Sequence, residues 1–296
     1  MKVNNNQGSG YCLCFSGEVG EYVFNDIIPL GLNIKAILTD FGSKGVIVKA
    51  KELGIPLFIG NPRKKDVTAW AIDNNITFDY LLSINYLFIL PSSFLGLSKT
   101  SINFHDSLLP KYRGRCPNVW SIINGEKYTG LTAHLMNADC DDGDIVMQER
   151  FPIASNDTGG TVREKTKKLY IKLIKLIIPN LESGKLKTKP QDKSKATYYG
   201  KRTPADGHID WSWQKQRIRN WVRAQAFPYP GAFAYLKNEK VIVNKVGYSS
   251  IGYVDTISNG EIIAMDNNRP VVKTQNGAIV LLEFSQIDFA IGDRFL

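Results

Sequence analysis

The chain has 296 residues, of which 43% are hydrophobic and 22% are charged, and its formal net charge is +9. This length allows two domains, and the apolar fraction can build ordinary cores, which excludes a wholly disordered chain. The N-terminal segment lacks the apolar stretch and cleavage site of a secretory leader, and no run approaches the roughly 18 apolar residues of a membrane span. We therefore expect a cytoplasmic protein without a membrane span.

The cysteines and histidines show no metal-binding pattern. The four cysteines have no CxxC spacing, and the three histidines form no ligand cluster in the sequence. We expect free thiols in a reducing compartment and no metal. The cysteines are Cys12, Cys14, Cys116 and Cys140.

Strand-like and helix-like segments alternate over the first 180 residues or so, which is typical of a parallel α/β domain. The pattern predicts a Rossmann-like, mostly parallel sheet. The expected strands are Tyr11 to Phe15, Ile34 to Leu38, Pro56 to Ile59, Tyr80 to Ile84 and Leu131 to Leu135. The expected helices are Val19 to Leu30, Lys65 to Asn74 and the long amphipathic stretch Thr161 to Ile178.

The composition changes near residue 183. Residues 183–204 are rich in lysine, serine, glycine and proline, which predicts a linker between a domain at 1–182 and a second domain at 205–296. Short β-like runs follow, with Asn276-Gly277 as a hairpin turn, and they indicate a small β-barrel. These runs are Ala232 to Leu236, Lys240 to Val246, Glu261 to Met265, Pro270 to Thr274 and Ala278 to Phe284.

The most informative polar residues are Asn103, His105 and Asp141. Asn103 and His105 alternate with the apolar residues of a strand, so their side chains point to the same side of the chain. Side chains at the carboxyl ends of strands line the ligand crevice of an open α/β sheet. Asp141 follows in an Asp-Asp-Gly-Asp turn. An isolated Asn or His is usually structural, and we interpret His134 and His208 in that way, but the trio together indicates a catalytic site.

Several motifs resemble the enzymes that transfer a formyl group from 10-formyltetrahydrofolate to an amine. Within that family the chain looks closest to formyltransferases of nucleotide-linked 4-amino sugars, including the bacterial enzyme that formylates UDP-4-amino-4-deoxyarabinose. The resemblance implies the formyltransferase fold with an OB-like C-terminal domain. The matching motifs are Asn103-x-His105, Ser107 to Gly114, Gly130-x-Thr132, Asp141-x-Gly143, Gly200 to Pro204, Trp221 to Ala224 and Pro230 to Phe233.

The resemblance also implies roles for individual residues. Asn103 would donate to the developing oxyanion, His105 would act as general base or second donor, and Asp141 would orient His105 and relay protons. The folate donor would contact Tyr86, Leu87, Phe88, Ile89, Ala138, Asp139 and Asp142. The acceptor would contact Ser107, Lys111, Tyr112, Arg113 and Gly114, a basic loop that suits an anionic ligand.

The identity of the acceptor stays open at this point. A sugar nucleotide, used for lipopolysaccharide or another surface glycan, is the first hypothesis. Methionyl-tRNA formyltransferase is the alternative: the net positive charge favours tRNA, but the short turn Thr39 to Gly45 leaves no room for the basic insertion of those enzymes. A formyl hydrolase or a folate-sensing relative is the third. The oligomeric state is also open, a homodimer included.

Overall fold

The computed structural model describes residues 8–296, which divide into two compact units. The first unit comprises the chain up to Gly114 together with Gly130–Arg150 and Lys165–Tyr198. The second comprises Arg115–Thr129, Phe151–Glu164 and Tyr199–Leu296. The expected absence of a secretory leader concerns a segment that lies largely outside the described residues.

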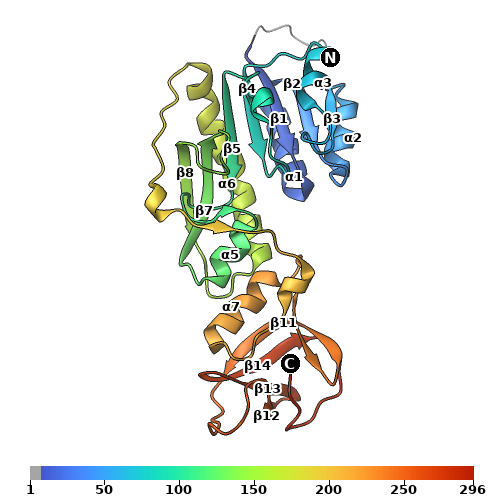
Figure 1. The fold of residues 1–296 in the computed structure, drawn as a ribbon, viewed down its shortest axis with the longest axis vertical. Helices are drawn as coiled ribbons and strands as arrows, with labels where there is room; N and C mark the ends of the chain where they lie inside the picture. Colours follow the sequence, from blue (N-terminus) through green and yellow to red (C-terminus); the bar gives the residue numbers. More distant parts are fainter. Residues whose placement is uncertain (1–7) are drawn as a thin grey trace. The chain divides into compact units, whose positions relative to one another are not determined.

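The first unit is built on a seven-stranded sheet with the order β3-β2-β1-β4-β5-β7-β8 (Figure 1). The neighbours from β3 to β5 pair in parallel, and β7 pairs antiparallel with β5. The predicted mostly parallel sheet is therefore confirmed. Its strands are β1 (Gly10–Phe15), β2 (Asn33–Thr39), β3 (Leu57–Ile59), β4 (Tyr80–Ile84), β5 (Thr100–His105), β7 (Tyr128–Leu135) and β8 (Ile145–Pro152).

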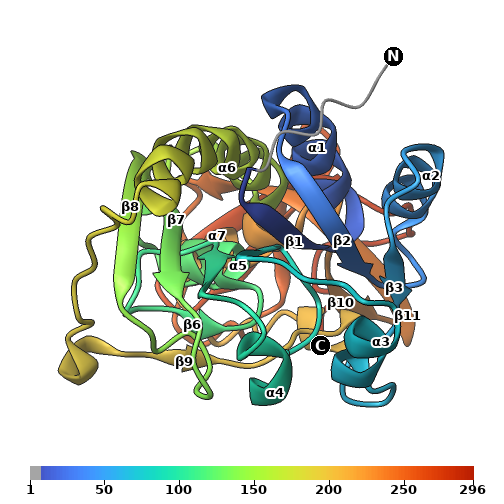
Figure 2. The same ribbon diagram turned by 90° about the horizontal axis from the view of Figure 1, so that it is seen from above.

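Helices cover both faces of this sheet, as Figure 2 shows. The side chains of β1 alternate between two apolar clusters, because Tyr11, Leu13 and Phe15 pack with α1, α2 and α6. Cys12 and Cys14 point to the other face and pack with α3 and α4. The helices are α1 (Gly17–Ile27), α2 (Lys44–Glu52), α3 (Val67–Asp73), α4 (Ser92–Leu95) and α6 (Gly159–Glu182). The helix α5 (Pro117–Ile123) belongs to the second unit.

The predicted long helix is confirmed as α6, which has 24 residues. The sequence did not predict α4, α5 or β8. The region expected as a linker makes specific pairs, since Lys189 bridges to Ile145 and β9 (Tyr198–Tyr199) pairs with β6 (Arg113–Gly114). Residues 183–204 therefore contribute to the structure around them.

The second unit contains a five-stranded antiparallel sheet with the order β10-β11-β14-β13-β12. The expected small β domain is thus confirmed, and its OB-like closure stays a prediction. Thr274 pairs with Gly277, so the turn of the last hairpin is Gln275-Asn276, one residue earlier than expected. The elements are α7 (Lys215–Gln225), β10 (Ala232–Leu236), β11 (Glu239–Ser249), β12 (Ile262–Asp266), β13 (Arg269–Thr274) and β14 (Gly277–Phe284).

The compact units divide the chain differently from the expected boundaries of 1–182, 183–204 and 205–296, which stay a prediction for the functional domains. The difference has a packing cause. Val119 and Ile122 of α5 and Val162 of α6 share one apolar cluster with α7 and the second sheet. Such contacts between residues distant in sequence are invisible to a boundary drawn from composition.

Among residues 8–296, no helix combines the length and apolar character needed to cross a membrane.

Candidate active site

Asn103 and His105 lie at the carboxyl end of β5, and their side chains share one face of the strand, as predicted. Antiparallel pairing sets β7 beside them, with Asn103 opposite His134 and His105 opposite Thr132. The pair Thr132-x-His134 has the same spacing as Asn103-x-His105. Two alternating polar pairs therefore meet across adjacent strands.

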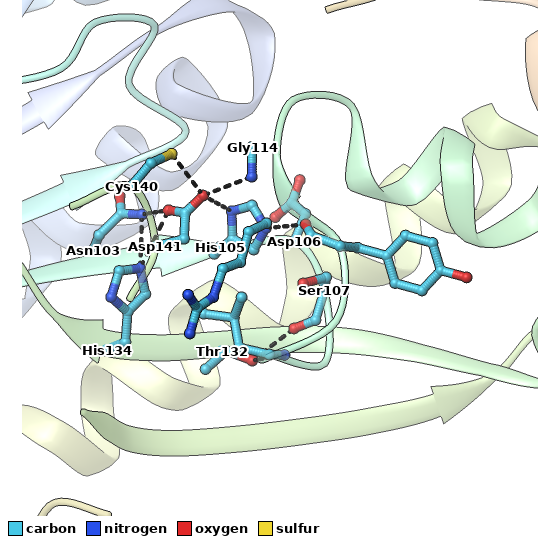
Figure 3. A network of polar contacts seen from close by, with 12 residues as sticks. Asn103, His105, Asp106, Ser107, Gly114, Thr132, His134, Cys140 and Asp141 are labelled. Atoms are coloured by element: carbon cyan, nitrogen blue, oxygen red, sulfur yellow. Dashed lines mark hydrogen bonds and ion pairs between the residues drawn. The ribbon is translucent and has the colours of Figure 1, made fainter. Parts of the chain in front are cut away.

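Asp141 joins this group from the turn that follows β7 (Figure 3). Its backbone adopts the left-handed conformation, with φ 54°, which non-glycine residues adopt infrequently. Gly143 follows two residues later, where a Cβ atom would collide with the carbonyl oxygen of Leu135. The close passage of the turn against β7 explains why glycine occupies position 143.

The Asp141 carboxylate is the centre of the polar network. Its Oδ2 accepts a hydrogen bond from the Gly114 backbone N–H at 2.8 Å and lies 3.6 Å from Nδ1 of His105. Its Oδ1 lies 3.4 Å from Asn103 Nδ2 and 3.5 Å from His134 Nε2. The three residues predicted from the sequence are therefore brought together, and a fourth, His134, accompanies them.

The environment of Asp141 favours its ionised form. Burial by itself would raise the pKa of this carboxyl group, which is only 10% exposed. The adjacent imidazole of His105 and the Gly114 N–H outweigh that effect and hold the pKa well below its usual range. Asp141 is therefore a carboxylate over the whole physiological pH range.

His105 is fixed through its other ring nitrogen. Nε2 donates to the backbone carbonyl of Tyr112 at 2.7 Å, since a carbonyl can only accept. Nδ1 then faces Asp141. The imidazole is 7% exposed, so its orientation is set by the protein.

His134 is the residue that the sequence interpretation missed. It is 3% exposed, and its Nδ1 donates to the carbonyl of Leu135 at 2.8 Å. In the neutral ring Nε2 is then an acceptor, and Asn103 Nδ2 donates to it at 3.1 Å. This bond fixes which end of the Asn103 amide faces the site. The available signal was the polar-x-His spacing that Thr132-x-His134 shares with Asn103-x-His105, but its use required the register of β7 against β5.

The loop expected to bind the acceptor turns most of its side chains inward. Arg113 is 1% exposed and forms an ion pair with Asp142 at 2.6 Å. Ser107 is fully buried, with its hydroxyl donating to the Lys111 carbonyl. Tyr112 contributes its backbone carbonyl to His105. Lys111 is the exposed member of the set, and the acceptor contacts stay a prediction.

The segment expected to bind the folate alternates between buried and exposed side chains. Leu87 and Ile89 are 43% and 47% exposed, whereas Tyr86 and Phe88 are partly buried and pack ring edge against ring face. The Tyr86 hydroxyl is buried and has no hydrogen-bond partner. The Leu87 N–H donates to Ser16 Oγ at 3.0 Å, which ties the segment to the end of β1.

The residues expected to form the opposite wall of the folate site, Ala138, Asp139 and Asp142, differ in exposure and in bonding. Ala138 and Asp139 are exposed, but Asp142 is engaged by Arg113 and by Lys193 at 2.8 Å. Tyr86 and Met136, two residues before Ala138, pack against the same apolar cluster. Exposed apolar side chains fit a flat heterocycle.

Chemically, the site offers a fixed amide donor, an imidazole and an ionised carboxylate at one point. Within residues 8–296, no group of three or more His, Cys, Asp or Glu side chains has the arrangement of a metal site. The set suits proton transfer combined with stabilisation of a developing negative oxygen.

Family models match the chain in two places. The formyl transferase model matches residues 63–178, which contain the whole polar network from Asn103 to Asp141. The model of the formyl transferase C-terminal domain matches residues 201–288, which contain the antiparallel sheet.

Solved structures resemble the chain at low sequence identity. WlaRD, a sugar 3N-formyl transferase determined in the presence of dTDP and 5-N-formyl-THF, is 19% identical, with a TM-score of 0.69, over 98% of this chain and 99% of that one. The N-formyltransferase from Helicobacter canadensis, in complex with folinic acid and dTDP-3-aminofucose, is 19% identical, with a TM-score of 0.70, over 92% and 98%.

HypX from Aquifex aeolicus in complex with tetrahydrofolic acid is 15% identical, with a TM-score of 0.65 over 94% of this chain. This chain spans only 44% of the HypX chain. At these identities the likeness shows a shared fold. The two family models match successive parts of the sequence that together make up more than half of it, and they show that the chain belongs to the formyl transferase family.

Proposed function

We propose that the protein transfers the formyl group of 10-formyltetrahydrofolate to the amine of a nucleotide-linked amino sugar. The observation that carries the proposal is the convergence of Asn103, His105 and Asp141 on one point at the end of β5. Such transfer forms a bond between the amine nitrogen and the formyl carbon, breaks the bond from that carbon to the folate nitrogen, and moves one proton from the amine to the folate.

Asn103 supplies the donor for the developing negative oxygen. One of its two amide hydrogens is held by His134 at 3.1 Å. The other lies along a long contact of 3.4 Å to Asp141, beyond the usual range, so it can turn to a better acceptor. A preorganised donor of this kind is worth about 2.7–4 kcal/mol in the transition state.

His105 and Asp141 handle the proton. The Tyr112 carbonyl holds His105 through Nε2, which leaves Nδ1 on the side of the carboxylate. Asp141 stays ionised and stabilises the positive charge that the imidazole acquires when it accepts the amine proton. No covalent link to the protein is required.

The donor is assigned to Leu87 and Ile89, whose exposed apolar side chains suit one face of a pterin ring, opposite the exposed turn at Ala138 and Asp139. The unpaired hydroxyl of Tyr86 lies in the same segment and gives it a polar group to offer. Two of the similar structures were determined with folate derivatives, which supports this assignment.

The acceptor is assigned to the class of sugar nucleotides, with Lys111 as the exposed cation of the loop at Ser107 to Gly114. The turn after β2 argues against a tRNA acceptor, because only residues 40–43 separate that strand from α2 and leave no room for a basic insertion. Two similar formyltransferases were determined with dTDP or dTDP-3-aminofucose, which supports testing dTDP-linked amino sugars first. Since both substrates are cytoplasmic metabolites, we assign the reaction to the cytoplasm.

A turnover assay tests this function. The protein is incubated with 10-formyltetrahydrofolate and a panel of dTDP-, UDP- and GDP-linked amino sugars, beside charged initiator tRNA, and acceptors are examined by mass spectrometry. We expect a mass gain of one formyl group on a sugar nucleotide. Formylation of the tRNA alone, with strong salt dependence, would replace the proposal by the tRNA enzyme. Formate release with no acceptor modified would indicate a hydrolase.

A further inference from the structure

Gln191 lies in the region expected as a linker, yet it is 8% exposed and contacts the turn that carries Asp141. Its Nε2 donates to the backbone carbonyl of Asp141 at 2.8 Å and to that of Gly143 at 2.7 Å. One side-chain amide therefore holds two carbonyls of the turn from outside it.

The orientation of the Gln191 amide is fixed by its second partner. Oε1 accepts from Arg113 Nη2 at 2.7 Å and from Arg113 Nε at 3.3 Å. A guanidinium has only donors and a carbonyl only accepts, so the amide has one orientation that satisfies both sides. A flipped amide would place its NH2 group against Arg113 and its oxygen against two carbonyls.

Arg113 holds the same turn a second time. Its Nη1 pairs with Asp142 at 2.6 Å and donates to the Tyr198 hydroxyl at 2.6 Å. Asp141, Asp142 and Gly143 are thus each bonded to the pair Arg113–Gln191. This buried bracing matters because Asp141 adopts a left-handed backbone, a conformation that surrounding contacts must maintain.

We propose that Gln191 is a positioning residue of the formyl transfer site, which acts by fixing the Asp141 turn so that its carboxylate meets His105 and Asn103. The inference rests on the proposed function. Gln191 touches the backbone of Asp141 and leaves the carboxylate free for its bonds to the site. Reacting groups must be held closely, and displacement by about 1 Å can lower the rate roughly 100-fold.

The test uses Gln191→Glu, which keeps the volume and the oxygen facing Arg113 but replaces the two donated hydrogen bonds by an oxygen. Gln191→Met is the second variant and removes all polar contacts at similar size. We expect kcat to fall about 10- to 100-fold in both, with KM for both substrates within about threefold of the wild type. The pH profile of kcat should also shift, because Asp141 and His105 no longer meet in a fixed geometry.

Gln225→Met is the matched control. Gln225 is 6% exposed, accepts from Arg202 and donates to the Trp221 carbonyl, so it has the same type of bonds in the second unit. This variant should lose stability as Gln191→Met does, with kcat and the pH profile within about twofold of the wild type.

The results distinguish a failure of the proposed function from a failure of the positioning role of Gln191. If the wild type formylates no acceptor, the proposed function fails and the positioning role fails with it. If the wild type is active and a folded Gln191 variant keeps the wild-type kcat and pH profile, only the positioning role is overturned. If both Gln191 variants fail to fold while the Gln225 variant folds, Gln191 is a residue of the scaffold and the inference is also overturned.

Discussion

Two loops at the carboxyl ends of neighbouring strands use their side chains in opposite ways. The segment 85–89, after β4, keeps Leu87 and Ile89 exposed and is tied down through a backbone N–H. The loop 107–114, after β5, buries Arg113 and holds His105 through the Tyr112 carbonyl. The first loop exposes apolar side chains, whereas the second buries Arg113 and contributes a backbone carbonyl that holds His105.

The largest effect is expected at His105, which the loop 107–114 holds through the Tyr112 carbonyl. We expect His105→Ala to lower kcat about 10²- to 10⁴-fold, because proton transfer loses its positioned base, with folate affinity nearly unchanged. Single-turnover kinetics and folate binding by fluorescence measure the two effects. His208→Ala, which loses one bond to the Leu296 carbonyl in the second unit, is the control. Wild-type turnover in the His105 variant would remove the imidazole from the mechanism.

The second prediction concerns the buried cation of the loop 107–114. Arg113→Ala should lower the free energy of unfolding by about 3–5 kcal/mol, because it leaves Asp142 without its buried partner. Denaturant titration measures this loss. Lys111→Ala, on the same loop but exposed, should change stability by less than about 0.5 kcal/mol and raise the acceptor KM. The opposite pattern, with a stable Arg113 variant and a large rise in its acceptor KM, would indicate that Arg113 binds the acceptor.

A smaller effect is expected in the segment 85–89. Leu87→Ala and Ile89→Ala should each raise the folate KM roughly fivefold, equal to about 1 kcal/mol, since each removes apolar surface that the bound ligand would cover. The unfolding free energy should hardly change, because both side chains are nearly half exposed. Leu53→Ala, at a leucine that is 44% exposed after α2, is the matched control. Equal folate KM values in all three variants would indicate that the folate donor does not bind to this segment.

The smallest effect is expected in the pH dependence of stability, which Asp141 influences only in acid. The folded-state pKa of Asp141 lies below its unfolded value of about 3.9, so its contribution to stability is present above that pH and is lost as the pH falls through the folded pKa. Asp141→Asn should therefore make the unfolding free energy less dependent on pH below about 5. Denaturant midpoints at a series of pH values test this. An unchanged pH dependence would show that other carboxyl groups dominate the acid transition.

The three residues proposed for catalysis were predictable because their spacing expresses a local rule. Asn103 and His105 share a face through strand alternation, and Gly143 allows the close turn beside Asp141. His134 was not predictable in the same way, because its contact with Asn103 depends on how β7 registers against β5. Gln191 was also not predictable, since nothing in a lysine-rich stretch of sequence indicates that one of its polar residues is buried.

The sequence by itself determined the alternation of strands and helices, the small β domain and the three polar residues proposed for catalysis, because apolar periodicity and short motifs are local properties of the chain. Only the tertiary structure decided that Arg113 turns inward, that His134 joins the site and that Gln191 braces the Asp141 turn. Each of these depends on which distant backbone atoms lie within hydrogen-bond distance, and burial of a polar side chain is tolerated only where such partners exist.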